Sequence, residues 1–117
     1  MKRLYAAMLN TVRGFARAFK NEAAARQEIA ALLLALPAGA WVAPNAAWYV
    51  AMIGALLLVL AVELVNTAIE KLADHVTPER HPQVALIKDY GSAAVFCTLL
   101  LAGLIWIAAL AIRSGYL

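Results

Sequence analysis

The chain has 117 residues, of which 65% are hydrophobic and only 15% are charged, against about 25% charged residues in an ordinary soluble domain. Its mean hydropathy of +0.78 excludes an ordinary soluble protein, and its ten basic and seven acidic residues matter through their positions more than through the net charge of +3. The length fits one domain, residues 1–117, and we expect an all-α integral membrane protein.

The first expected helix, at about residues 2–21, has an apolar and a basic face. Its apolar residues recur at helical spacing, at Leu4, Tyr5, Met8, Leu9, Val12, Phe15 and Phe19. Four basic residues lie mostly off that stripe, namely Lys2, Arg13, Arg17 and Lys20. This pattern is typical of an amphipathic helix that lies on an anionic lipid surface. The basic residues therefore indicate a membrane, and not a nucleic acid, as the partner.

The next segment, residues 29–62, carries no charge and is too long for a single crossing. As one helix its 34 residues would extend about 51 Å, whereas the hydrocarbon layer is about 30 Å thick. Pro37, Gly39 and the pair Pro44-Asn45 are the residues that break helices here. We therefore expect two spans, at about 26–42 and 46–76.

A third span is expected at about 88–112, because residues 91–112 are again free of charge. Between the second and third spans, Thr77-Pro78 and His81-Pro82 predict a loop or a new helix start. Lysine and arginine are concentrated before the first span and between the second and third, and are absent from the hairpin around Pro44. The positive-inside rule then predicts a multi-pass protein with a cytoplasmic N-terminus.

A polar stripe lies at the cytoplasmic end of the second span. Glu63, Asn66 and Glu70 share one helix face, with the two carboxylates about 10 Å apart along the axis. An ionised side chain at membrane depth costs about 2.5 to 3.5 kcal/mol, so such residues usually mark a functional site. Glu22 and Glu70 are suited to Mg²⁺, Lys88 to phosphate charge, and Glu63 to accepting a proton from a lipid hydroxyl.

Simpler interpretations exist for some of these residues. Glu22 and Arg26 are spaced i, i+4 and would then form an exposed helix pair. Lys88 and Asp89 would be a loop charge and a helix-start residue favoured by the helix dipole. No glycine-rich phosphate loop is present, so a nucleotide would be bound without that backbone cradle.

Three polar segments together resemble the small prokaryotic diacylglycerol kinases. They are Asn21-Glu22-Ala23-Ala24 with Arg26-Gln27-Glu28, then Glu63-Leu-Val-Asn66-Thr67-Ala-Ile-Glu70, and Lys88-Asp89 with Gly91-Ser92-Ala93-Ala94-Val95. The similarity covers nearly the whole chain. It implies a homotrimer of three-span subunits with a surface helix, located in the bacterial inner membrane. The implied reaction transfers the γ-phosphate of ATP to diacylglycerol and gives phosphatidic acid, at active sites shared between subunits.

The resemblance also implies residue roles. Glu63 matches the catalytic base, and Glu22 and Glu70 match the magnesium ligands. The nucleotide contacts would be Arg3, Asn10, Glu22, Glu70, Glu79, Arg80, His81, Lys88 and Asp89. The lipid contacts would be Arg3, Glu28, Glu63, Asn66 and Ser92. Asn10 and Val12 stand where enterobacterial members have aromatic residues, and Arg80 stands where they have a tyrosine.

Three alternative functions remain open at this point. Undecaprenol kinases have the same fold, and Asn66-Thr67-Ala-Ile-Glu70 and Pro78-x-x-His81-Pro82 favour them, while Gly91-Ser92-Ala93-Ala94-Val95 favours diacylglycerol. A proton-coupled exporter would use Glu63 to bind protons but gives no role to the other polar residues. A non-catalytic assembly subunit predicts that Glu63→Gln has no effect.

Overall fold

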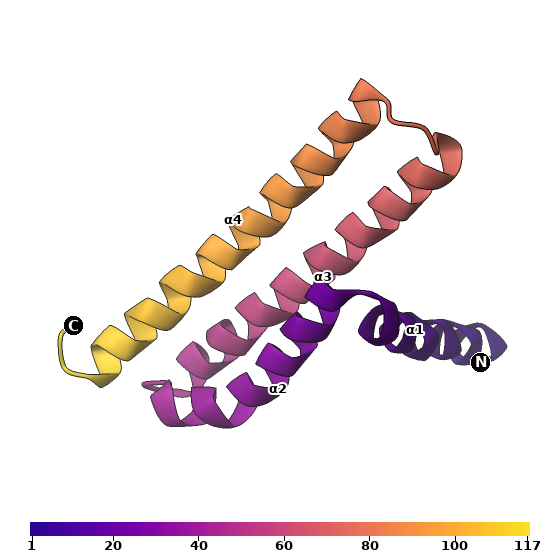
Figure 1. Ribbon diagram of the computed structural model, residues 1–117. Coiled ribbons are helices and arrows are strands. Elements are labelled where there is room, and N and C mark those ends of the chain that lie inside the picture. Colours follow the sequence, from indigo (N-terminus) through magenta and orange to yellow (C-terminus); the bar gives the residue numbers. More distant parts are fainter.

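The computed structural model describes all 117 residues and consists of four helices with no strand. They are α1 (Lys2–Asn21), α2 (Ala23–Val42), α3 (Ala46–Val76) and α4 (Pro82–Arg113). The two longest, α3 and α4, run antiparallel and side by side, and α2 packs along α3 (Figure 1). Helix α1 contacts α2 and points away from the other helices (Figure 1). The all-α class expected from the sequence is confirmed.

Side-chain caps set the starts of the two long helices. The Asn45 side chain accepts a hydrogen bond from the Trp48 backbone N–H at 3.0 Å, which satisfies one free donor at the start of α3. His81 Nδ1 accepts from the Gln83 N–H at 3.1 Å, and Pro82 occupies the first turn of α4, where a missing N–H costs nothing. The sequence allowed a loop or a helix start at His81-Pro82, and the structure has a helix start there.

Extended backbone at Glu22 separates α1 from α2. Pro37 lies inside α2 and does not end it, so the break between α2 and α3 falls at Pro44-Asn45 alone. A proline within a helix removes one backbone hydrogen bond, and helix packing in a bundle tolerates that loss.

The buried core is small and lies toward the α2–α3 hairpin. Met52 and Val59 of α3 are the largest fully buried side chains, and they pack against small residues of the neighbouring helices, Ala102 and Ala109 among them. Two hydrogen bonds join the helices at this end. Trp106 Nε1 donates to the Met52 carbonyl at 3.1 Å, and the Tyr49 hydroxyl donates to the Leu36 carbonyl at 2.8 Å.

Two helices, α3 and α4, are long and apolar enough to cross a membrane. Only 22% and 11% of their most apolar stretches are buried within the chain, so lipid or further copies must cover the rest. Helix α2 carries Arg26 and Glu28 in its first half and is not among these candidates. Its role as a third span stays a prediction, as does the attachment of α1 to the membrane surface.

Candidate functional site

Three carboxylates, from α3 and from the start of α2, gather around Glu63. The carboxylates of Glu22, Glu28 and Glu70 all interact electrostatically with Glu63, which is half-buried near the middle of α3. One carboxylate oxygen of Glu28 is buried without a hydrogen-bond partner. No three acidic, histidine or cysteine side chains converge closely enough to hold a metal ion alone. A bound cation would therefore take further ligands from outside the protein.

Asn66 lies between this cluster and α4. It is the only buried polar residue, with 7% of its surface exposed. Its Nδ2 donates a hydrogen bond to Glu70 Oε1 at 3.2 Å, while its Oδ1 has no hydrogen-bond partner and faces Gly91 of α4. The amide thus connects the polar stripe of α3 with the neighbouring helix, and it fixes one oxygen of Glu70.

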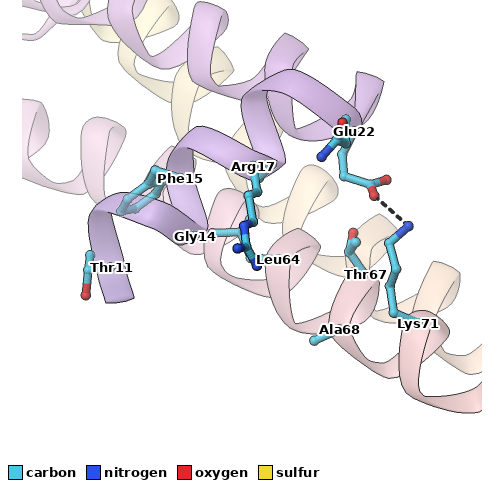
Figure 2. Close-up of a pocket in the computed structure, with 11 residues that line it drawn as sticks. Thr11, Gly14, Phe15, Arg17, Glu22, Leu64, Thr67, Ala68 and Lys71 are labelled. Carbon is cyan, nitrogen blue, oxygen red and sulfur yellow. Dashed lines mark ion pairs between the residues drawn. The ribbon is translucent and has the colours of Figure 1, made fainter. Parts of the chain in front are cut away.

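Glu22 joins α3 through an ion pair. Its Oε1 lies 3.0 Å from Lys71 Nζ (Figure 2). The alternative that Glu22 pairs with Arg26 is wrong, because the Arg26 Nη1 donates instead to the Phe19 carbonyl at 3.0 Å, near the end of α1. Arg26 can reach that carbonyl because the chain bends at Glu22, so the i, i+4 spacing does not decide its partner.

The ion pair lines a pocket of about 760 Å³ between α1 and α3. Its walls mix small, apolar and basic side chains. Figure 2 shows Arg17 extending from α1 toward Leu64, with Thr67 and Lys71 further along α3. The lining residues are Thr11, Gly14, Phe15, Arg17, Ala18, Asn21, Glu22, Leu64, Thr67, Ala68 and Lys71. An amphipathic molecule with an anionic end suits such walls.

A second pocket, of about 560 Å³, lies at the loop between α3 and α4. Five of its nine lining residues are ionisable, and the lining consists of Asp74, Pro78, Glu79, Arg80, His81, Pro82, Val84, Ala85 and Lys88. The Lys88 Nζ lies 3.0 Å from Asp74 Oδ1, which links α4 to α3. Four residues that the resemblance assigned to the nucleotide therefore share one pocket, and Asp89 follows them on the exposed surface of α4.

The remaining predicted site residues lie elsewhere on the single chain. Arg3 and Asn10 are exposed on α1, which points away from the α3–α4 loop (Figure 1). Ser92 is exposed on α4. The single chain thus holds two parts of the predicted site, the carboxylate cluster and the loop pocket, and Arg3 and Asn10 lie on α1 outside both.

The structure adds three residues that the sequence interpretation did not place in the site: Lys71, Asp74 and Gly91. Asp74 had a signal, since it continues the α3 stripe one turn beyond Glu70. The partners of Lys71 and Gly91 come from other helices, and no local pattern indicates such tertiary contacts.

Helices that can cross a membrane, together with a carboxylate and amide cluster between them, define a helical membrane protein with a polar site. Residues 9–110 match the family model of the prokaryotic diacylglycerol kinases. The diacylglycerol kinase of Escherichia coli K12 is 39% identical over 94 residues, which cover 80% of this chain and 77% of that protein. The chain belongs to the prokaryotic diacylglycerol kinase family, a family of kinases, so the resemblance inferred from the sequence is confirmed.

Two further relatives support this membership. The diacylglycerol kinase of Haemophilus influenzae is 36% identical over 96 residues, covering 82% of this chain and 81% of that protein. The diacylglycerol kinase of Pseudomonas aeruginosa is 38% identical over 106 residues, covering 91% and 86%. The similarity therefore extends over most of the four-helix fold.

Proposed function

We propose that this protein is a Mg²⁺-dependent diacylglycerol kinase, which transfers the γ-phosphate of ATP to diacylglycerol and gives phosphatidic acid. The observation that carries the proposal is the cluster of carboxylates around Glu63, which lies on a helix apolar enough for a membrane. The relatives named diacylglycerol kinase favour this lipid over undecaprenol. The reaction takes place at the cytoplasmic face of the bacterial inner membrane.

Glu63 is the proposed catalytic base. Phosphoryl transfer requires mainly the positioning of the reactants and the neutralisation of phosphate charge, so the protein needs few reactive groups. A carboxylate that is half-buried on a membrane helix can meet the hydroxyl of a lipid and accept its proton. Glu28, Asn66 and Ser92 are proposed to bind the lipid with Glu63, together with Arg3.

Glu22 and Glu70 are the proposed magnesium ligands. Mg²⁺ prefers hard oxygen ligands, commonly one or two carboxylates with phosphate oxygens and water. Glu70 fits this demand, because one of its oxygens is held by Asn66 and the other has no protein partner. Glu22 is held only by Lys71, which is 70% exposed, and such a pair is weak enough to open. When bound, the ion supplies positive charge against the phosphates.

The loop pocket is the proposed nucleotide site. Arg80, His81 and Lys88 provide groups that can pair with phosphate, and Glu79 and Asp89 provide acceptors for the rest of the nucleotide. Glu22 and Glu70 would hold the metal ion that neutralises the charge of the nucleotide's phosphates. Arg3 and Asn10, on the surface helix, are the remaining proposed nucleotide contacts.

The proposed assembly is a homotrimer with shared active sites. Each subunit has a surface helix at about 2–21 and spans at about 26–42, 46–76 and 88–112, with a cytoplasmic N-terminus. Two features support this arrangement: Arg3 and Asn10 lie apart from the loop pocket within one chain, and most apolar surface of α3 and α4 is uncovered. Light scattering on the purified protein, corrected for bound detergent, measures the number of subunits directly.

The decisive test is a labelled-ATP assay on purified protein in detergent micelles, with a panel of lipid alcohols. Diacylglycerol should be phosphorylated in the presence of Mg²⁺, and Glu63→Gln should be inactive. A much faster reaction with undecaprenol would replace the proposed substrate. An absence of lipid phosphorylation in micelles, where no proton gradient can exist, would contradict a kinase and favour an exporter.

A further inference from the structure

Gly91 of α4 lies directly against the buried amide of Asn66. A Cβ added to Gly91 would overlap the Asn66 Oδ1. At Gly14, Gly54 and Gly103, which also lie within helices, an added Cβ would meet open space. Position 91 is therefore the place in the long helices where a missing side chain makes room for a neighbouring polar group.

The orientation of the Asn66 amide follows from its two neighbours. A carboxylate only accepts hydrogen bonds, so the amide must present Nδ2 to Glu70 and consequently Oδ1 to Gly91. The Oδ1 has no N–H or O–H partner, and it lies against the Gly91 backbone in the manner of Cα–H···O contacts between packed helices. A side chain at position 91 would remove the space that this orientation requires.

We propose that Gly91 is a positioning residue for the Glu70 carboxylate, because it admits the Asn66 amide that holds Glu70 Oε1. This inference rests on the proposed function in taking Glu70 as a magnesium ligand. A methyl group at position 91 displaces the Asn66 amide, and Glu70 then loses its hydrogen bond. The loss should appear in Mg²⁺ use.

The test compares Gly91→Ala with Gly103→Ala, a control on the same helix. Alanine is the better helix former, so Gly103→Ala should keep or raise the melting temperature, whereas Gly91→Ala should lower it in metal-free buffer. Gly91→Ala should also raise the Mg²⁺ concentration for half-maximal activity by about tenfold or more, as expected for a lost hydrogen bond to a charged group.

A double-mutant cycle with Asn66→Ala isolates the contact. Once the amide is removed, Gly91→Ala should no longer lower the melting temperature in EDTA, and the Mg²⁺ requirement should equal that of Asn66→Ala alone. Should Gly91→Ala fail to fold, the double variant still folds according to this inference, and its failure to fold overturns it. Additive melting shifts, or an unchanged Mg²⁺ requirement in Gly91→Ala, likewise overturn it.

Different results would refute the proposed function and the positioning role of Gly91. If the wild type and Gly103→Ala both leave every lipid alcohol unphosphorylated, the proposed function is wrong, and the role of Gly91 in metal use is overturned with it. If both are active and Gly91→Ala cannot be distinguished from them, only the positioning role is wrong.

Discussion

Replacing Glu63 with glutamine should stop catalysis and stabilise the fold at the same time. Glutamine has nearly the same size and shape, so the packing around the half-buried side chain is preserved. It cannot accept the proton of the lipid hydroxyl, and general acid–base catalysis contributes about 10²- to 10⁴-fold to rates. Turnover of Glu63→Gln should therefore fall by about 100-fold or more.

The gain in stability follows from the crowding of carboxylates. Glu63 and Glu70 are seven positions apart on the helix, which places them about 10 Å apart along α3. At that distance two like charges repel by about 0.4 kcal/mol in water and about 1.7 kcal/mol at an effective dielectric constant of 20. Glu22 and Glu28 add to the repulsion of Glu63. The free energy of unfolding should accordingly rise by about 0.5 to 2 kcal/mol in metal-free buffer.

The assay pairs initial rates from labelled ATP with thermal unfolding in EDTA. Glu70→Gln is the matched control. It removes the same repulsion between Glu63 and Glu70, but the carboxylate it replaces is the proposed magnesium ligand and not the base. Raised Mg²⁺ should restore part of its turnover and none of that of Glu63→Gln. A Glu63→Gln variant with nearly wild-type turnover refutes the base assignment, and a lower melting temperature refutes the argument from repulsion.

Three further predictions address other parts of the molecule. Lys88→Gln should raise the KM for ATP by about tenfold, because a charged contact to phosphate is lost. It should lower the free energy of unfolding by less than about 1 kcal/mol, because the Lys88–Asp74 ion pair is exposed. Kinetics measures the first effect and calorimetry the second. Trp106→Phe removes the hydrogen bond to the Met52 carbonyl and should destabilise the fold by about 1 kcal/mol, with unchanged turnover; inactivation would give Trp106 another role. EDTA should abolish phosphate transfer and added Mg²⁺ should restore it, whereas EDTA-resistant transfer contradicts the metal assignment.

The helical architecture was predictable because its determinants are local. Long uncharged runs, the helix breakers at Pro44-Asn45 and His81-Pro82, and their capping side chains all act within a few residues of the chain. Pro37 was less informative, since a proline either ends a helix or is carried within one, and neighbouring helices decide the outcome. Local pattern therefore gave the class and the main breaks, and tertiary packing set the rest.

The candidate site was predictable only where it follows one helix. The spacing of Glu63, Asn66 and Glu70 alone places them on one face. The Glu22–Lys71 ion pair joins the start of α2 to α3. The position of the Asn66 amide depends on Gly91, which is 25 residues away in the sequence. Contacts of this kind have no periodic signature. The nucleotide and lipid roles on α1 come from family resemblance and stay predictions.

The length of α3 determines the depth at which chemistry can occur. Its 31 residues extend about 46 Å, half as long again as the hydrocarbon layer of about 30 Å. A crossing that starts at Ala46 leaves the acyl region after about 20 residues, near Asn66, and carries Glu70 into the headgroup zone. The free hydroxyl of a glycerolipid resides at that level. With the proposed topology, a diacylglycerol would react while both its tails remain in the leaflet, and no tunnel would be needed to accommodate them.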